Sequence, residues 1–356
     1  MSLRRISAFV FVMIALLLAL TPARAAAPQR AADQKLRVFF FDVEGGQSTL
    51  FITPAGQSLL IDTGWADNNG RDADRIASIA HKAGLNHLDY VLITHYHDDH
   101  VGGVPQLLSR IPVTTFLDHG PNRELTPDVS GNYDAYQKVL AAGLASGKQK
   151  NLHLKPGDTI PIPGLKINVV TADGNVLAAP GTGEVNPYCA GLPTYPRDTT
   201  ENSRSLGTRI QFGKLTLVDL GDLTSDKEVA LMCPANRLGT ADIYIVSHHG
   251  WYPSSSPALV YALHPRVAIM DNGALKGGSP ATFKTLRNSP GLENLWQLHY
   301  SVEGGQTWNG PAEFIANINT PQQPDAGNYI ELTASPDGSF DVLNSRTGAT
   351  KHYPAK

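Results

Sequence analysis

Short apolar runs alternate with amphipathic segments along most of the chain, and this alternation predicts strands interleaved with helices. The first three runs are separated by turn-forming residues, which is typical of an antiparallel meander; they cover residues 35–42, 48–53 and 58–62. A helix is predicted over residues 71–83, where Ile76, Ile79 and Ala80 recur at helical spacing. The next apolar run, residues 88–94, predicts a buried strand that ends directly before a His-rich segment.

The alternation continues through the second half of the chain. Further helices are predicted over residues 101–110, 133–145, 227–232, 257–263 and 280–287. Further strands are predicted over residues 114–117, 158–170 (a hairpin), 205–212, 214–220, 241–247, 267–272 and 294–300, with a last hairpin formed by residues 329–334 and 339–344. Because each half combines strands with helices, the pattern predicts an α/β protein whose two sheets pack face to face under outer helices.

A chain of 356 residues is long enough for one large, well-buried domain. We expect its body to cover residues 36–300, with residues 301–356 as a C-terminal extension whose hairpin packs on the same domain. Residues 171–204 are rich in Gly, Pro, Asn and Thr and lack a periodic pattern. A stretch of this length is usually functional or disordered, and we expect a loop at the active site.

The first 25 residues have the pattern of a secretory signal peptide. Arg4 and Arg5 precede an apolar run over residues 8–20, and residues 23–25 (Ala-Arg-Ala) fit a cleavage site. The apolar run is short for a membrane-spanning helix, which needs about 20 residues, so cleavage is favoured over an uncleaved anchor. The sequence thus predicts an exported protein, periplasmic or extracellular, that has no membrane span after cleavage.

Charge and cysteine content limit the partners. The formal net charge is −3, and removal of residues 1–25 would take away three Arg and no acid, leaving 26 basic against 32 acidic residues, or −6. Non-specific binding of nucleic acid depends on Lys and Arg at the phosphates, so no strong nucleic-acid surface is expected.

Cys189 and Cys233 could pair in an exported protein, or they could remain two unreactive thiols.

The segment after the fourth strand carries the clearest chemistry. Three imidazoles and two carboxylates lie within six residues, His95-Tyr96-His97-Asp98-Asp99-His100, and burying them together requires a compensating cation. On extended backbone, His95 and His97 point the same way and can bind one ion. Asp99 and His100 follow where the chain turns toward a helix and can bind a second. Imidazole and carboxylate groups favour zinc, and Mn²⁺ or Fe would also fit.

Other candidate ligands also lie at strand ends. Asp222 follows an apolar strand, and its two carboxylate oxygens can bridge two ions; Asp219, on the opposite strand face, is a weaker candidate. His248 and His249 follow another apolar strand. We assign His248, nearer the strand, to a metal ion, and His249 to orienting the substrate or donating a proton to the leaving group.

Two residues could support this centre from outside it. His119 ends a short strand and could be a further ligand, a substrate contact or a turn residue bonded to backbone. Asp62 ends the third strand, where we expect it to hydrogen-bond a ligand histidine.

These residues resemble the metallo-β-lactamase superfamily, whose signature H-x-H-x-D-H stands in full as His95, His97, Asp99 and His100. Over roughly residues 36–300 the chain resembles the hydrolase domain of ComEC/Rec2-type competence proteins, through residues 41–43 (Phe-Asp-Val), 60–64 (Leu-Ile-Asp-Thr-Gly), 221–222 (Gly-Asp) and 247–250 (Ser-His-His-Gly). The resemblance implies a four-layer αββα sandwich with metals at one edge of the sheets. It also implies a set of ligands consisting of His95, His97, Asp99, His100, Asp222 and His248.

Two departures from the pattern concern the loops. Competence-type domains have Gly-Gln-Gly-Asp after the first Asp-Val, whereas here residues 44–48 read Glu-Gly-Gly-Gln-Ser. Many members of the superfamily also have a ligand histidine just before the bridging aspartate. Residues 201–203 (Glu-Asn-Ser) stand there instead, which resembles the competence-type pattern, so Asn202 becomes a candidate substrate contact and His119 a candidate replacement ligand. No membrane channel domain accompanies the hydrolase, so DNA import is not implied.

The ligands indicate hydrolysis without a protein nucleophile. Two ions sharing a hydroxide would lower its pKa to about 7, Asp99 would help to orient it, and the second ion would offset the developing charge. We favour a phosphodiester, either a small molecule or an envelope component, as the substrate. A lactone, β-lactam or other acyl bond is the alternative. A different class also fits: a metal-binding envelope protein without turnover.

Overall fold

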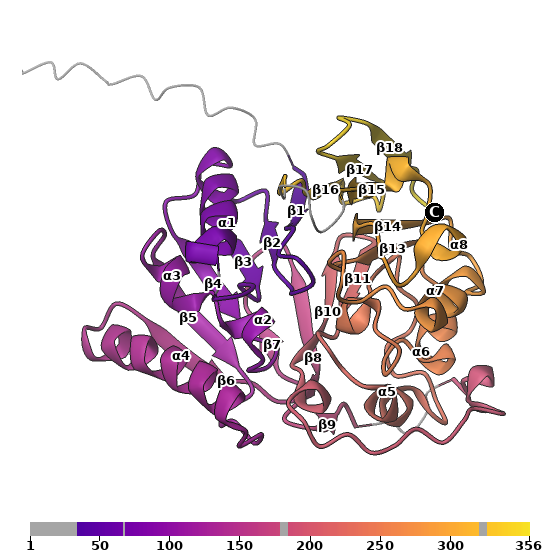
Figure 1. The fold of residues 1–356 in the computed structure, drawn as a ribbon, viewed down its shortest axis with the longest axis horizontal. Coiled ribbons are helices and arrows are strands. Elements are labelled where there is room, and N and C mark those ends of the chain that lie inside the picture. Colours follow the sequence, from indigo (N-terminus) through magenta and orange to yellow (C-terminus); the bar gives the residue numbers. More distant parts are fainter. Residues whose placement is uncertain (1–33, 67, 179–183, 320–325) are drawn as a thin grey trace, which may run out of the picture. The chain divides into compact units, whose positions relative to one another are not determined.

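The computed structural model describes residues 34–66, 68–178, 184–319 and 326–356. The predicted signal peptide, residues 1–25, lies outside the described residues. The described residues form two large sheets (Figure 1). Within them, the structure contains no helix of the length and apolar character needed to cross a membrane.

The first sheet has nine strands in the order β18-β17-β16-β1-β2-β3-β4-β5-β6. Pairing is parallel from β3 to β6 and antiparallel elsewhere. The strands are β1 (Leu36–Phe40), β2 (Thr49–Ile52), β3 (Ser58–Ile61), β4 (Leu88–Leu92), β5 (Val113–Asp118), β6 (Lys150–His153), β16 (Ile330–Ala334), β17 (Phe340–Asn344) and β18 (Thr350–Tyr353).

The second sheet has the order β15-β14-β13-β12-β11-β10-β8-β7, with β9 paired to β8. Its strands are β7 (Thr159–Ile160), β8 (Lys166–Ala172), β9 (Asn175–Val176), β10 (Gly207–Phe212), β11 (Leu215–Asp219), β12 (Ile243–Ile245), β13 (Val267–Met270), β14 (Asn294–His299) and β15 (Ile315–Asn317). Strands β11 to β15 are parallel, as expected where helices connect successive strands.

Helices cover the outer face of each sheet (Figure 1). Those on the first sheet are α1 (Arg71–Lys82), α2 (Asp98–Val101), α3 (Val104–Leu108) and α4 (Pro127–Ala145). Those on the second are α5 (Ser225–Met232), α6 (Pro257–Leu263), α7 (Pro280–Arg287) and α8 (Gly305–Trp308). Three apolar clusters follow these layers: one between the sheets and one between each sheet and its helices. The predicted αββα sandwich is therefore confirmed.

The C-terminal residues are built into both sheets. Strand β15 extends the second sheet, and the predicted hairpin is present as β16 and β17, to which β18 adds a third strand. Strand β16 pairs with β1 over five residues, from Leu36 opposite Ala334 to Phe40 opposite Ile330. Residues 301–356 thus complete the sheets that the first 300 residues begin.

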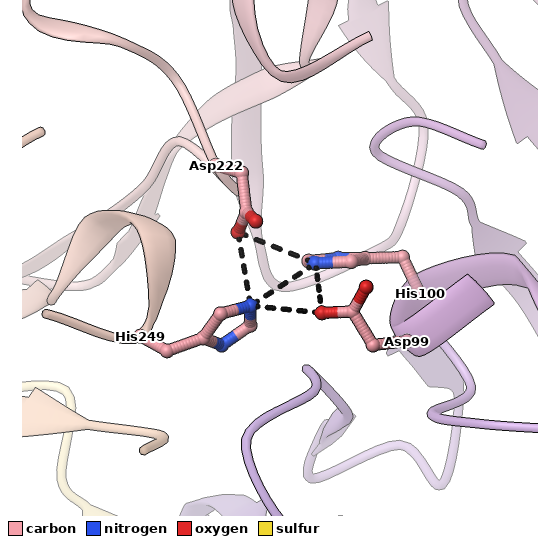
Figure 2. Close-up of side chains that lie close together, drawn as sticks. All are labelled: Asp99, His100, Asp222 and His249. Carbon is pink, nitrogen blue, oxygen red and sulfur yellow. Dashed lines mark hydrogen bonds and ion pairs between the residues drawn. The ribbon is translucent and has the colours of Figure 1, made fainter. Parts of the chain in front are cut away.

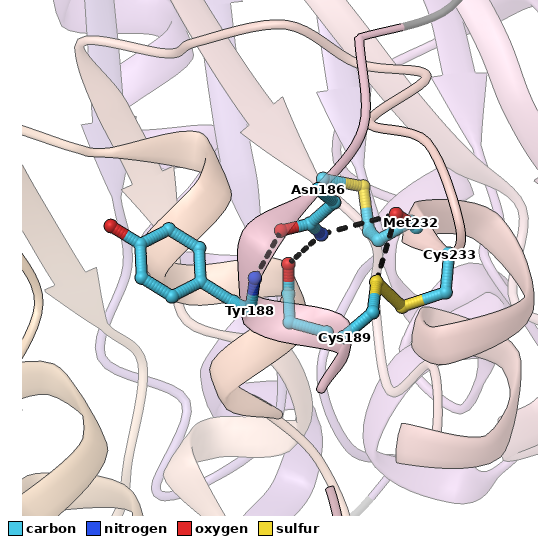
Figure 3. The surroundings of a disulfide bond; sticks show 6 residues. Asn186, Tyr188, Cys189, Met232 and Cys233 are labelled. Atoms are coloured by element: carbon cyan, nitrogen blue, oxygen red, sulfur yellow. Dashed lines mark hydrogen bonds between the residues drawn. A yellow bond between two sulfur atoms is a disulfide. The ribbon is translucent and has the colours of Figure 1, made fainter. Parts of the chain in front are cut away.

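A disulfide joins the predicted active-site loop to the second half of the domain (Figure 3). Cys189 and Cys233 are bonded, with their Cα atoms 5.8 Å apart. Beside the bond, the Asn186 side-chain amide donates to the backbone carbonyls of Met232 and Ala258. These contacts fasten the loop to the end of α5 and to α6. The part of this loop over residues 179–183 lies outside the described residues.

Candidate metal centre

Three chain segments bring ionisable side chains to one edge of the two sheets. The first sheet supplies the segment after β4, which runs into the short helix α2, and the second sheet supplies the segments after β11 and β12. Because parallel strands end at the same edge, their following residues converge there. The side chains of His95, His100, Asp222 and His249 are at most 2% exposed, so they face one another with little water between them.

One compact group, shown in Figure 2, consists of Asp99, His100, Asp222 and His249. His100 Nε2 lies 3.2 Å from Asp99 Oδ2 and 3.3 Å from Asp222 Oδ1. His249 Nε2 lies 3.1 Å and 3.3 Å from the same two oxygens. The two imidazole nitrogens are 3.3 Å apart. Two nitrogens and two carboxylate oxygens therefore point at one small volume, which could hold a metal ion.

A second group of imidazoles surrounds the other oxygen of Asp222. His95 Nε2 lies 3.9 Å and His248 Nε2 3.5 Å from Asp222 Oδ2. His97 Nδ1 is 3.1 Å from His95 Nε2. Asp222 thus offers one oxygen to each group, which is the arrangement required of a carboxylate that bridges two ions.

The second ring nitrogen of each imidazole faces an oxygen outside the two groups. For His100 this is Asp62 Oδ2 at 2.7 Å, and for His97 it is Glu124 Oε2 at 3.0 Å. The partners of the other rings are Thr94 Oγ1 for His95 at 3.1 Å, Ser254 Oγ for His248 at 3.1 Å, and Asp271 Oδ1 for His249 at 3.6 Å. Ligand histidines commonly have such partners, because these orient the ring and leave the inner nitrogen for the metal.

Burial and the facing charges perturb these groups strongly. Desolvation by burial, reinforced by His100, holds the pKa of His95 well below its ordinary value. Desolvation also acts on His100, but the carboxylates of Asp222 and Asp99 outweigh it and raise the pKa of His100 well above its ordinary value. For His249, Asp222 likewise outweighs desolvation and raises the pKa to about 10. The buried carboxylates of Asp99 and Asp222 thus need a nearby positive charge to offset the cost of burying them, and a divalent cation would supply it.

The backbone at the site is unusual. His248 and His249 have φ values of 56° and 54°, and Asp62 has 58°. Residues other than glycine rarely adopt this left-handed conformation, which costs about 1–3 kcal/mol and occurs at functional sites. Two successive left-handed residues turn the chain sharply after β12, so adjacent imidazoles reach different sides of Asp222.

Gly46 allows the loop after β1 to pack against the backbone of Asp99. A Cβ at Gly46 would lie 2.4 Å from the Asp99 carbonyl oxygen, and the Gln47 amide donates to that same oxygen at 3.1 Å. The loop that departs from the competence-type pattern therefore supports the backbone of Asp99.

The structure places the remaining predicted residues around this centre. Asp62 touches His100, and Asn202 Nδ2 lies 3.4 Å from His248 Nε2. His119 is not brought to Asp222; its Nε2 instead contacts Glu201 Oε2 at 2.9 Å. Asp219 is also outside both groups and accepts a hydrogen bond from Gln47.

The assignment of the two adjacent histidines changes in part. We predicted His248 as the metal ligand and His249 as the substrate or proton-donor residue. The structure puts His249 in the compact group with Asp99 and His100, while His248 lies on the other side of Asp222.

Sequence reasoning missed several residues of the site, among them Lys276, Glu124 and Glu201. Lys276 Nζ forms an ion pair with Asp99 Oδ2. Its one signal in the sequence is its place in a glycine-rich stretch, residues 273–278, that follows a predicted strand. Glu124 stands in a polar turn with no motif, so its contact with His97 depends on tertiary structure alone.

A further acidic group lies elsewhere in the fold and consists of Asp42, Glu44 and His299. Arg75 Nη1 lies 3.3 Å from Asp42 Oδ2. A guanidinium therefore already supplies positive charge to this group, in contrast to Asp222, whose ion pairs among the described residues are all with imidazoles.

Parts of this chain are similar to known proteins. Residues 42–189 match the metallo-beta-lactamase superfamily. ComE operon protein 3 of Bacillus subtilis (strain 168) is 24% identical over 249 residues, covering 66% of this chain and 28% of that protein. Recombination protein 2 of Haemophilus influenzae is 26% identical over 234 residues, covering 65% of this chain and 24% of that protein. The chain therefore spans about a quarter of the length of these relatives.

Among solved structures, the metallo-beta-lactamase fold protein YhfI from Bacillus subtilis is similar with a TM-score of 0.44 and 14% identity, covering 74% of this chain and 96% of that one. The match to the metallo-β-lactamase superfamily covers residues 42–189, and the predicted resemblance to ComEC/Rec2-type proteins is confirmed.

Proposed function

We propose that this protein is a metal-dependent hydrolase with two divalent ions, and that it cleaves a phosphodiester. The observation that carries the proposal is that the two carboxylate oxygens of Asp222 face different pairs of imidazoles. Oδ1 faces His100 and His249, and Oδ2 faces His95 and His248. A carboxylate that only accepted hydrogen bonds would not require four buried rings around it.

In this proposal the donor atoms divide into two sets. His95, His97, His248 and Asp222 Oδ2 would hold the first ion. Asp99, His100, His249 and Asp222 Oδ1 would hold the second. Nitrogen-rich sets of this kind favour zinc over magnesium or calcium, which prefer oxygen ligands. Mn²⁺ or Fe fits the same donors.

When bound, such a pair of ions activates water and offsets the negative charge that develops during hydrolysis. The chain's own residues would orient the groups around it. Asp62 and Glu124 fix the rings of His100 and His97 through hydrogen bonds at 2.7 Å and 3.0 Å. Asn202, whose amide lies beside His248, is placed to contact the substrate. The similarity to ComEC/Rec2-type proteins supports the choice of a phosphodiester.

We also propose export, on the strength of the signal-peptide pattern in residues 1–25. An acidic mature chain in the envelope or outside the cell fits a small phosphodiester or a phosphate-linked envelope component better than long nucleic acid.

A panel of chromogenic substrates tests the reaction. The mature protein, residues 26–356, is loaded with zinc and assayed on bis-p-nitrophenyl phosphate, a chromogenic β-lactam and a lactone, each with a chelator control. Elemental analysis measures the ions per chain. We expect two ions and chelator-sensitive cleavage of the phosphodiester. Cleavage of only the lactam or lactone would replace the substrate, and metal binding without any turnover would favour a non-catalytic protein.

His97→Ala provides the active-site variant for this panel. We expect turnover to fall to the background rate, because His97 contributes a donor atom beside His95. His81→Ala is the matched control, since His81 is exposed and its ring hydrogen-bonds to the Leu85 carbonyl, outside both ligand groups. An unchanged rate in His97→Ala would exclude this centre as the place of catalysis.

A further inference from the structure

A lysine ammonium lies against the group proposed to hold the second ion. Lys276 Nζ forms an ion pair with Asp99 Oδ2. The same oxygen lies 3.2 Å from His100 Nε2 and 3.1 Å from His249 Nε2. One carboxylate oxygen is therefore shared by a side-chain cation and by the donors of the second site.

The position of Lys276 is fixed by its loop. The Lys276 carbonyl accepts from the Gly273 amide at 2.9 Å, and the Gly278 amide donates to the His249 carbonyl at 2.9 Å. Next to Lys276, Gly45 packs so closely that a Cβ there would lie 2.8 Å from the Lys276 Cβ. The ammonium also stands 4.8 Å from the ring centroid of Trp65. The Lys276 side chain is 32% exposed, so the packing of its loop, rather than complete burial, keeps the ammonium beside Asp99.

The first group has a different electrostatic environment. The described neighbours of Asp222 Oδ2 are the imidazoles of His95 and His248. Imidazoles are neutral when they bind metal, whereas a lysine ammonium stays positive and repels a nearby divalent ion. A ligand oxygen of the second site is therefore already paired with a lysine ammonium, whereas the described ion pairs of Asp222 Oδ2 in the first site are with imidazoles.

We propose that Lys276 weakens the second site, so that the centre loads its ions in order, the first tightly and the second loosely. An incoming second ion must displace the ammonium from Asp99 Oδ2 and then remain near it. At low metal concentration the protein would hold one ion, and the second would exchange. This inference rests on the proposed two-ion centre and adds to it a difference in affinity.

Stepwise zinc affinities of the mature protein test the idea. Competition with a chromophoric chelator gives the two dissociation constants, and elemental analysis after dialysis gives the ions retained. We expect Lys276→Met to tighten the second step at least tenfold and to leave the first unchanged. Lys276→Arg keeps the charge and should behave like the wild type. Lys284→Met, which removes an exposed lysine on α7, is the control for net charge.

The outcomes separate this inference from the proposed function. Two steps in the wild type with an unchanged or weaker second step in Lys276→Met would overturn the role of Lys276. Equal tightening of both steps, or tightening in Lys284→Met, would also overturn it, because the effect would then be a general change of charge. A wild type that binds no second ion at saturating zinc would overturn the two-ion centre itself. Lys276→Gln, checked by circular dichroism, replaces the Met variant if that one fails to fold.

Discussion

At the scale of single residues, the contacts behind the ligands decide how well the centre binds metal. Glu124 Oε2 faces His97 Nε2 at 3.0 Å and also accepts the Glu201 amide at 2.8 Å. The hydrogen bond with His97 is also the main reason why the pKa of Glu124 lies below its ordinary value, although burial opposes it. The carboxylate therefore stays ionised and holds the ring with Nδ1 toward the site.

We predict that Glu124→Ala weakens the first zinc-binding step about 10- to 100-fold, the usual cost of losing such a partner. The chelator competition described above measures it. Glu124→Gln retains an oxygen acceptor and should recover part of the affinity. If Glu124→Ala binds the first ion as tightly as the wild type, the contact does not orient His97.

A second residue-scale prediction concerns Glu228, a buried carboxyl on α5 that belongs to neither ligand group. Its oxygens accept the backbone amides of Ser255 and Ser256 at 2.8 Å and 2.6 Å. Desolvation outweighs these hydrogen bonds and raises its pKa from 4.5 to about 7. The folded protein therefore holds the proton more tightly than the unfolded chain does, so the stability contributed by this group is lost as the pH rises from about 4.5 through 7.

The expected loss between pH 4.5 and 8 is about 3 kcal/mol, since each pKa unit corresponds to about 1.4 kcal/mol. Urea unfolding of the wild type and Glu228→Gln across this range measures it. The glutamine does not titrate, so the difference between the two free energies of unfolding should change with pH in this direction. A difference that is constant with pH would show that Glu228 is ionised in the folded state.

Residue-scale reasoning from the sequence paired His95 with His97 and Asp99 with His100, as the structure does, but it did not place His249 in the group of Asp99 and His100. The spacing of His95, His97, Asp99 and His100 was sufficient because a strand end and a helix start fix their directions. The positions of the His248 and His249 rings depend on the left-handed backbone of these two residues, which no local sequence pattern predicts. Lys276 and Glu124 reach the site from distant segments, so only the tertiary fold reveals them.

At the scale of elements, the loop after β13 is tied to the turn after β12. Gly277 has a φ of 81°, and a Cβ there would lie 2.1 Å from the His249 carbonyl oxygen. Gly56 has the same φ, but a Cβ there would meet nothing within 4 Å. Alanine at Gly56 therefore shows the free-energy cost of a left-handed alanine alone, whereas alanine at Gly277 adds the steric clash with the His249 carbonyl.

We predict that Gly277→Ala weakens the second zinc-binding step at least tenfold, because the clash displaces His249. Gly56→Ala should lose about 1–2 kcal/mol of stability from its left-handed alanine and bind both ions normally. Thermal unfolding and zinc titration measure the two effects. Equal zinc affinities in both variants would mean that the loop can relax without moving His249.

Most elements could be predicted because their apolar periodicity is strong. The helix predicted over residues 257–263 is α6, and that over residues 280–287 is α7. The helix predicted over residues 101–110 is shorter in the structure: α3 covers Val104–Leu108, and α2 begins earlier, at Asp98, and ends at Val101. A Cβ at Gly103, between the two helices, would lie 2.2 Å from the Thr63 carbonyl oxygen. Strands β6, β9, β15 and β18 were missed. Strands β6, β9 and β18 are short and mostly exposed, and β15 is buried but has only three residues, so all four carry little pattern.

At the scale of the whole molecule, the sequence predicted two packed sheets but not the order of their strands. Strand order depends on pairings between distant segments, such as β1 with β16, which local periodicity does not encode. This pairing makes the C-terminal strands part of the first sheet. The apolar side chains of β16 and β17, among them Ile330, Leu332, Phe340 and Val342, belong to the cluster between the two sheets.

We therefore predict that a chain ending at residue 328 fails to fold, although it keeps every proposed metal ligand. The truncation exposes the edge of β1 and removes several large core side chains, each worth about 1.5–3 kcal/mol when buried. Their sum is comparable with the total stability of a typical domain, about 5–15 kcal/mol.

The soluble fraction, the thermal unfolding transition and the zinc content measure the result. A chain ending at Pro354 is the control, because it keeps all three strands and the contact from Arg266 to the Pro354 carbonyl. Should the shorter chain unfold cooperatively at the same temperature as the control, residues 329–353 would be an appendage, and the metal centre would depend on the first 328 residues alone.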